Sequence, residues 1–276
     1  MTLPDRVALG TMHGKAAAIA PPLAGLGITV VVPDGLDTDA FGTFTGERPR
    51  AGTMLDAARA KARAAIAATG LPVGLASEGA YGPHPVIPFL AQGRELLLWL
   101  DTRTGQEIVE LLTDPSPRYD QVEVASPAAA TEFLARIRFP ETALVVASAS
   151  DRTRPLAKGV RDPDELHRVL AVATADGPAL LQTDMRAHLN PRRMEVIGRL
   201  AGQLAVRLAR TCGQCGAPGW GFVRHGPALP CAWCSAPTLL PGGEIHGCTA
   251  CGLETLFPRP DGKTEADPGT CPLCNP

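Results

Sequence analysis

Short apolar runs alternate with alanine-rich segments through the first 75 residues. Short apolar runs predict three strands, at residues 6–10, 28–32 and 71–75. The second run is β-branched and bounded by Gly27 and Pro33, which indicates a strand buried on both faces. An alanine-rich segment that reaches Leu26 predicts a helix broken by Pro21 and Pro22, and residues 53–69 predict a helix that ends at Gly70. Strands that alternate with helices indicate a largely parallel sheet with crossover helices.

The middle of the chain has the pattern of antiparallel strands. Residues 95–101 and 106–112 are apolar runs joined by a short connection that contains Gly105, which is typical of a hairpin. Residues 119–125 are expected to extend the same sheet. Capping residues and apolar runs predict the other elements: helices at 127–138, from 162 and at 191–210, and strands at 142–147 and 179–183. The predicted fold class is α/β, with a mixed, partly parallel sheet and crossover helices.

All eight cysteines lie in the last 65 residues as four C-x-x-C knuckles, Cys212/Cys215, Cys231/Cys234, Cys248/Cys251 and Cys271/Cys274. Two knuckles complete a tetrahedral four-sulfur site, so four knuckles predict two structural zinc ions. Disulfides are disfavoured because 211 residues precede the first cysteine. We therefore expect an α/β domain over residues 1–209 and a zinc-ribbon domain over residues 210–276.

The spacing of the knuckles leaves their pairing open. The second and third knuckles flank a short segment, as in a zinc ribbon, which favours pairing them and leaves the first knuckle to pair with the fourth. Sequential pairing and an interleaved cross-brace are the alternatives. His225 and His246 lie near knuckles, but eight thiolates already satisfy two ions, so neither histidine is expected to bind metal.

Charge and hydropathy narrow the classes of partner. The chain has 26 Lys and Arg against 28 Asp and Glu, and from Arg210 onward four basic residues face five acidic ones. Because nucleic-acid binding needs a basic stripe, that function is disfavoured. No apolar stretch reaches 18 residues and the first residues lack the pattern of a signal peptide. We expect no membrane span and a cytoplasmic location, where thiols stay reduced.

Candidate chemistry gathers around the turn Gly10-Thr-Met-His-Gly-Lys15 at the end of the first predicted strand. Ligands bind at this end of open α/β sheets, and a hydroxyl, an imidazole and an ammonium at a helix start suit phosphate. An ordinary turn with Lys15 in solvent is the alternative. Further polar groups follow along the chain: Gly46–Arg50, Asp56, Lys61, Ser77–Gly79 and Tyr81–His84.

Two acids and one late cluster have competing interpretations. Asp56 forms a capping box with Thr53 or serves chemistry, and Glu78 holds a divalent cation at the sheet edge or is a solvated loop acid. Residues 183–193 place cations and donors near a helix start, where they recognise phosphoryl groups or a base, or simply form a capped helix entry. These groups are Arg186, His188, Asn190, Arg192 and Arg193. Lys158 to Arg161 is a weaker candidate for the same kind of anion recognition, and a plain loop is the alternative.

The stretch from Val30 to Gly82, with Gly52-Thr-Met-Leu-Asp-Ala-Ala-Arg-Ala-Lys61 and Gly74-Leu-Ala-Ser-Glu-Gly79, resembles the inosine triphosphatase-like and Maf-like house-cleaning nucleoside triphosphate pyrophosphatases. By position, the resemblance assigns Thr11, His13 and Lys15 to the opening motif. It assigns Asp56 and Lys61 to the helix motif and Glu78 to the acid after a buried strand. It implies that Mg²⁺ bridges a triphosphate whose hydrolysis releases pyrophosphate. The sequence departs from the pattern at His13, where the group has Asn, and at Asp56, which is a shorter acid.

Two functional hypotheses follow. The first is a divalent-metal-dependent hydrolase that releases pyrophosphate from nucleoside triphosphates or acts on a similar phosphorylated small molecule. Lys15, Asp56 and Glu78 would then be catalytic, and the substrate-binding residues would be Thr11, His13, Lys61, Arg186, His188 and Arg193. The alternative is a non-catalytic nucleotide-sensing or protein-binding module that interacts through the zinc ribbon. The opening Thr11-Met-His-Gly-Lys15 and the cysteine tail together also resemble an uncharacterised bacterial family.

Overall fold

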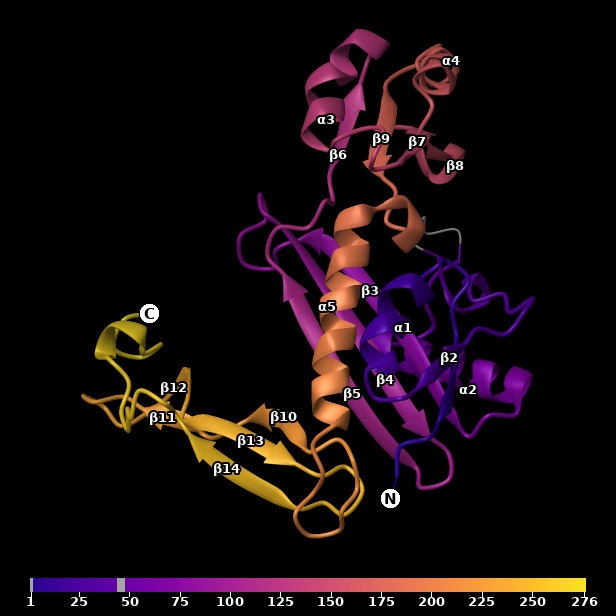
Figure 1. The fold of residues 1–276 in the computed structure, drawn as a ribbon. Helices are drawn as coiled ribbons and strands as arrows, with labels where there is room; N and C mark the ends of the chain where they lie inside the picture. The colour runs from indigo at the N-terminus through magenta and orange to yellow at the C-terminus, as the bar shows by residue number, and fades with distance from the viewer. Residues whose placement is uncertain (1, 44–47) are drawn as a thin grey trace. The chain divides into compact units, whose positions relative to one another are not determined.

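A computed structural model of the chain describes residues 2–43 and 48–276. The chain divides into two compact units (Figure 1). One comprises Pro4–Ala205, and the other comprises Val206–Pro276 together with residues 2–3. We call them the α/β unit and the cysteine unit and describe each by itself.

The first sheet of the α/β unit has five strands in the order β2-β1-β3-β4-β5. They are β1 (Arg6–Leu9), β2 (Thr29–Val31), β3 (Val73–Pro83), β4 (Ala91–Asp101) and β5 (Gln106–Asp114). β1 pairs in parallel with β2 and β3, whereas β3, β4 and β5 are antiparallel. The predicted hairpin between β4 and β5 is confirmed.

Helices lie on both faces of this sheet. They are α1 (Ala16–Ala24), α2 (Met54–Thr69) and α5 (Pro191–Leu208), with the 3₁₀ turns η1 (Asp39–Phe41) and η3 (Ala187–Leu189). Ala76 and the α2 residues Ala58 and Ala62 share one buried cluster, so even-numbered β3 positions face α2. Side chains alternate along a strand, so odd-numbered positions face away from α2. On that side Arg193 of α5 contacts Glu95 of β4.

The predicted ends of α2 are confirmed. Thr53 caps the helix by accepting from the backbone N–H of Asp56, and the Asp56 carboxylate accepts from the N–H of Thr53 in return. Gly70 ends the helix in the left-handed conformation, with φ at 70°. The predicted break in α1 is wrong, since the helix runs through Pro21 and Pro22. Both prolines stand in the second half of a nine-residue helix, which leaves no long segment beyond them to kink.

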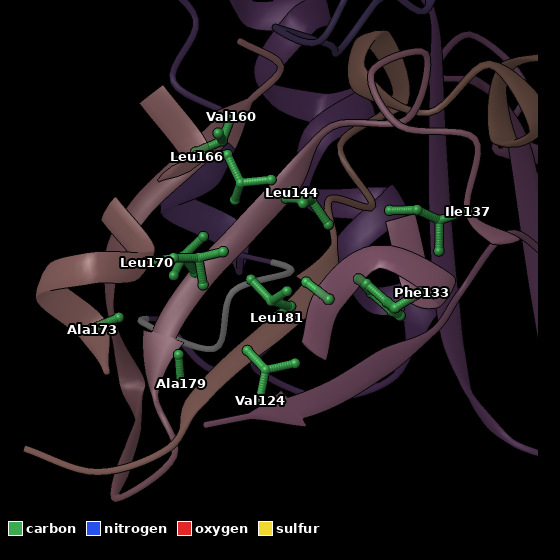
Figure 2. Close-up of a cluster of buried hydrophobic side chains, with 12 residues drawn as sticks. Val124, Phe133, Ile137, Leu144, Val160, Leu166, Leu170, Ala173, Ala179 and Leu181 are labelled. Carbon is green, nitrogen blue, oxygen red and sulfur yellow. The ribbon is translucent and has the colours of Figure 1, made fainter. Parts of the chain in front are cut away.

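The second sheet is antiparallel, in the order β6-β9-β7-β8. Its strands are β6 (Gln121–Val124), β7 (Leu144–Ser148), β8 (Asp151–Val160) and β9 (Ala179–Thr183). The accompanying helices are η2 (Pro127–Ala130), α3 (Thr131–Arg136) and α4 (Pro163–Ala173). Figure 2 shows Phe133 of α3 and Leu170 of α4 packed against strand residues such as Leu144 and Leu181. Both helices therefore cover the same face of the sheet.

Two predictions about the sheets need correction. The strands are mostly antiparallel. β1 pairs in parallel with β2 and β3, whereas β3, β4 and β5 follow one another as antiparallel neighbours. The connections through α3 and α4 each pass over a strand that runs in the opposite direction, so neighbours in the second sheet are also antiparallel. Residues 119–125 do not extend the first sheet, since β6 pairs with β9 in the second one. Lys158 and Arg161, expected in a loop or an anion site, lie in or just after β8, a strand that the sequence pattern missed.

The cysteine unit contains five short strands in two small sheets, β10-β13-β14 and β11-β12. They are β10 (Gly221–His225), β11 (Ala228–Pro230), β12 (Pro237–Pro241), β13 (Gly243–Gly247) and β14 (Glu254–Pro258), followed by the turn η4 (Pro268–Thr270). The second knuckle is the turn between β11 and β12, and the third is the turn between β13 and β14. This unit has little apolar core apart from its cysteines.

Candidate functional site

A cavity of about 260 Å³ lies where β1 ends beside β3. The register pairs Leu9 with Leu75, after which β1 stops and β3 continues to Pro83. Side chains rather than a strand therefore meet the edge of β3 beyond Leu75. They come from the turn after β1, the η1 region, the loop before α2, α2 and β3 itself. The lining residues are Gly10, Thr11, His13, Lys15, Thr38, Asp39, Gly42, Thr43, Arg50, Lys61, Glu78, Gly79, Ala80 and Tyr81.

A buried carboxylate, Glu78, is held between two cations in this cavity. Its side chain is on the α2 face of β3, and Lys61 of α2 places Nζ 2.5 Å from its Oε1. Arg50 reaches the other oxygen at 3.2 Å and donates to the carbonyl oxygen of Gly79 at 2.9 Å. The backbone of α2 passes so close to the turn that a Cβ on Gly10 would lie 2.5 Å from the carbonyl oxygen of Lys61. Only glycine fits there without a backbone shift.

Lys15 is a third cation of the cavity, and it differs from the other two. Its side chain is 6 % exposed, and Nζ donates to the backbone carbonyl of Ser77 at 2.9 Å. Within the described ranges, no carboxylate lies within ion-pair distance of this amine. Burial, reinforced by the nearby charge of Arg193, lowers the pKa of Lys15 to about 7. A substantial fraction of the amine is therefore neutral near pH 7.

His13 lies at the mouth of the same turn between an acid and a second imidazole. Its Nε2 is 3.0 Å from Oδ1 of Asp39, and its ring stacks on His188 with centroids 5.4 Å apart. Burial lowers the pKa of His13, and hydrogen bonding to Asp39 opposes that shift. The lowered pKa favours the neutral form of this imidazole. Gly14 has φ at 66°, and a Cβ there would lie 3.6 Å from Cβ of His188.

One wall of the cavity is backed by a buried ion pair. Arg193 and Glu95 are each 1 % exposed, with Nε of the arginine 2.6 Å from Oε1 of the glutamate. The Tyr81 hydroxyl donates to the same oxygen at 2.6 Å, and burial beside Glu95 raises the pKa of Tyr81. A Cβ on Gly79 would lie 2.5 Å from Glu95 and 2.7 Å from Arg193. Arg193 therefore supports the wall from behind and is not among the lining residues.

Asp56, predicted to be catalytic, does not reach the cavity. Its carboxylate accepts from Thr53 at both the backbone nitrogen and the hydroxyl, at 3.0 and 2.7 Å. The side chain is exposed and lies 3.4 Å from Arg59, one turn along the helix. These hydrogen bonds lower the pKa of Asp56. The structure thus gives Asp56 the capping role, and the expected meeting of Asp56 with Glu78 is not found.

The late cluster from residue 183 to 193 separates into different roles. Arg186 makes a bidentate pair with buried Asp184 and does not line the cavity. His188 joins the site through its stacking on His13. Arg192 pairs with Asp114, which the sequence did not predict. The residues Gly46 and Glu47, named with Arg50 as candidates, lie outside the described residues.

Two partners in the site escaped the sequence analysis. The burial of Glu95 could have been predicted from the sequence. It alternates in step with the apolar residues Leu97 and Trp99 of β4, which places its side chain on the same buried face. A charged residue at such a position needs a partner. No sequence pattern predicted the contact of Asp39 with His13, because Asp39 lies in the short turn η1 within a loop.

The cysteines form two four-sulfur clusters. One contains Cys212, Cys215, Cys248 and Cys251, and the other contains Cys231, Cys234, Cys271 and Cys274. Within each cluster the sulfurs lie within 4.8 Å of one another, and the short cross-knuckle distances are 3.6, 3.7, 3.8 and 3.8 Å. Tetrahedral zinc with bonds of about 2.3 Å separates sulfurs by about 3.8 Å, so the donor sets fit. All eight cysteines are free thiols rather than disulfides.

This pairing corrects the prediction for the knuckles. The first knuckle pairs with the third and the second with the fourth, which is the interleaved cross-brace. The segment from 235 to 247 is not a short hairpin, because β12 pairs with β11 while β13 pairs with β10 and β14. The chain therefore runs from the second knuckle to the third through two different sheets. His225 and His246 are in neither cluster.

Each cluster uses four thiolates and leaves no open ligand position, which is typical of a structural metal site. The first sulfur of a knuckle accepts a backbone N–H, from Gln214 to Cys212 and from Trp233 to Cys231, at 3.4 Å in both cases. One cysteine of each knuckle is buried: Cys212, Cys231, Cys248 and Cys271. The clusters can thus hold two metal ions with structural roles.

A family model described as "Domain of unknown function (DUF6671)" matches residues 61–276. The match begins at Lys61 and includes Glu78 and both cysteine clusters. Neither a curated protein nor a solved structure matches the chain. The pyrophosphatase-like fold and activity therefore stay predictions. Of the helices in the described ranges, none combines the length and hydropathy required to span a bilayer.

Proposed function

We propose, for this chain that belongs to the DUF6671 family, that the α/β unit binds a phosphorylated small molecule in the cavity at the end of β1. The cysteine unit is folded around two structural zinc ions in this proposal. The two units carry different chemistry.

The observation that supports ligand binding is the imbalance of charge around Glu78. Lys15, Arg50 and Lys61 line one cavity, and one buried carboxylate lies among them. Asp39 is the other acid of the lining, and it is engaged with His13. Charges withdrawn from water need compensation, and groups with a strongly shifted pKa gather at functional sites. A bound anion would supply the missing negative charge.

The donor types favour a phosphoryl group among the anions. Arg50 presents a planar fork of N–H donors, Lys61 is a compact point charge, and Thr11 adds a hydroxyl. The volume of about 260 Å³ accommodates a small molecule rather than a polymer. The cavity also lies at the carboxyl end of a parallel strand, where open α/β sheets bind ligands.

Binding is better supported than metal-dependent hydrolysis. The acids assigned to Mg²⁺ are apart, since Asp56 caps α2 while Glu78 is paired with Lys61 and Arg50. In the described ranges, the groups of three or more Asp, Glu, His or Cys residues suited to a metal are the two cysteine clusters. We therefore favour a nucleotide-sensing or metabolite-binding role over a pyrophosphatase.

Calorimetry of the full chain with its metals tests this function. Inorganic phosphate, pyrophosphate, a nucleoside triphosphate and the matching nucleoside would each be titrated with and without Mg²⁺, and pyrophosphate release would be followed in parallel. We expect the phosphorylated compounds to bind without Mg²⁺ and the nucleoside not to bind. Absence of binding by every phosphorylated compound at millimolar concentration would refute the proposal. Turnover that requires Mg²⁺ would restore the hydrolase hypothesis.

A protein partner for the cysteine unit is supported by apolar side chains around the second cluster. Trp233 and Leu273 lie within its knuckles and are 80 % and 73 % exposed, and Leu239 of β12 is also exposed. The cations Arg224 and Arg259 are paired with acids, which argues against a nucleic-acid surface. Co-purification tests this role: a partner retained by the full chain should be lost on Trp233→Ser. A partner retained equally by this variant would contradict a role for the exposed knuckle.

A further inference from the structure

The amine of Lys15 is placed as a nucleophile rather than as a simple countercharge. In the cavity, Arg50 and Lys61 both pair with Glu78, and His13 pairs with Asp39. Lys15 is the lining cation that meets a neutral acceptor, the carbonyl oxygen of Ser77, with no carboxylate partner among the described residues. Burial makes an ammonium in that position costly, so the charged and the neutral amine are both populated near pH 7.

A neutral amine at this place has a free electron pair. One N–H is directed to Ser77, which fixes the nitrogen and leaves its lone pair available. Desolvation and neighbouring cations are the means by which proteins activate lysine for attack on carbonyl carbon. Both are present here, because Lys15 is 6 % exposed and Arg193 and Lys61 lie close enough to act on its charge.

We propose that Lys15 forms an imine with the carbonyl carbon of a phosphorylated aldehyde or ketone bound in this cavity. The inference rests on the proposed phosphate-binding function and names the class of ligand for the same site. Arg50 and Lys61 would hold the phosphoryl group, and the carbonyl end would point to Lys15. The phosphoryl group thus orients the ligand for attack.

The reaction balances without an oxidant or reductant. The lone pair of the amine forms the C–N bond while the carbonyl π electrons move to oxygen, which takes a proton to give a carbinolamine. The nitrogen loses one proton, a second protonation lets the hydroxyl leave as water while the nitrogen lone pair forms the C=N bond, and the nitrogen then loses its second proton. Amine and carbonyl thus become imine and water. Protonation of the imine nitrogen gives a cation whose charge the phosphoryl group offsets.

His13 is placed to move these protons. It lies in the same turn as Lys15, lines the same cavity and is held at Nε2 by Asp39. Burial lowers the pKa of His13 and so favours the neutral imidazole, which can accept a proton during the reaction. The Asp39–His13 pair therefore supplies an acid–base group beside the amine.

Reductive trapping on the full chain tests the proposal. The probes are glyceraldehyde 3-phosphate and, as a matched compound without a carbonyl, glycerol 3-phosphate, each with sodium cyanoborohydride near pH 7. The chain has four lysines, and the exposed residues Lys158 and Lys263 serve as internal controls. We expect one adduct on the peptide that contains Lys15, at least tenfold above the adducts on the two exposed lysines. Excess pyrophosphate should suppress it tenfold or more, and Lys15→Met should abolish it.

The outcomes separate this inference from the function on which it rests. Equal labelling of Lys158, Lys263 and Lys15 would overturn it, as would labelling that pyrophosphate does not reduce. If calorimetry shows that both phosphates bind but no adduct forms at Lys15, the imine is refuted and phosphate binding stands. If neither probe binds, the imine is refuted, and if pyrophosphate and the other phosphorylated compounds do not bind either, both proposals fail. The competition uses the wild-type chain, so it remains decisive even where Lys15→Met does not fold.

Discussion

Paired cysteine substitutions distinguish the crossed arrangement of the knuckles from the alternatives. Cys215→Ser with Cys251→Ser removes two thiolates from the same cluster and leaves the other cluster whole. Cys215→Ser with Cys274→Ser removes one thiolate from each cluster. If the first knuckle instead paired with the fourth, the two double variants would exchange their consequences. Each variant therefore serves as the control for the other.

Loss of the ion from the cluster of Cys212, Cys215, Cys248 and Cys251 should have a large effect on stability, because few apolar contacts stabilise the surrounding residues at this end of the unit. The cluster of Cys212, Ala217 and Cys248 is joined by partly buried Trp220 and Leu253. Burial of a large apolar side chain contributes about 1.5–3 kcal/mol, so the two large residues supply about 3–6 kcal/mol at most. Metal binding in small zinc modules supplies about 10–16 kcal/mol per ion. Loss of the ion should therefore unfold this end.

Native mass spectrometry gives the metal content of each chain, and limited proteolysis reports which end has unfolded. We expect two ions for the wild type, one for the same-cluster variant, and none tightly bound for the split variant. In the same-cluster variant, cleavage should appear near the first and third knuckles, while the second and fourth stay protected. One ion in the split variant and none in the same-cluster variant would refute the crossed pairing.

Three further predictions concern the α/β unit. The pKa of Lys15 falls from 10.5 in the unfolded chain to about 7 in the folded chain. Between these pH values the unfolded chain binds more protons, so the free energy of unfolding rises with pH. In urea unfolding, the wild type should gain about 2 kcal/mol relative to Lys15→Met between about pH 7 and about pH 9, and a difference that stays constant with pH would contradict this. Arg193→Met leaves Glu95 buried without its cation and should lower the free energy of unfolding by about 3–5 kcal/mol in the same assay. The double variant with Glu95→Gln should lose less than Arg193→Met alone. Losses that simply add in the double variant would contradict an ion pair between the two residues. Asp56→Ala should lower thermal stability without changing the affinity for pyrophosphate, and a tenfold weaker affinity would return Asp56 to the site.

Local signals in the sequence predicted local structure well. The pattern around α2 predicted its cap at Thr53 and its end at Gly70, because both depend on residues within the helix itself. The hairpin of β4 and β5 was also predicted, from two apolar runs joined by a short turn that contains Gly105. The sequence did not predict that the later strands form a second sheet. β6 pairs with β9, which lies far along the chain, and such pairing depends on packing between distant segments.

The same limit applies to the site. Lys15, Lys61 and Glu78 were recognised from a turn, a helix and a strand end, and the structure places all three in one cavity. Asp56 was equally consistent with a cap and with chemistry, and its short side chain satisfies the cap. Pairing of the knuckles could not be read from spacing, because any two C-x-x-C turns can complete the same tetrahedron.

The central claim is that the cations beside Glu78 bind an anion, and calorimetric titration of pyrophosphate into three forms of the full chain tests it most directly. These are the wild type, Arg50→Met and Arg103→Met, the last removing an arginine that pairs with Asp101 and does not line the cavity. We predict that Arg50→Met weakens the affinity at least tenfold, since a charged hydrogen bond contributes about 1.5–3 kcal/mol, and that Arg103→Met leaves it unchanged. Equal affinities for all three forms, or no binding to the wild type, would contradict the claim.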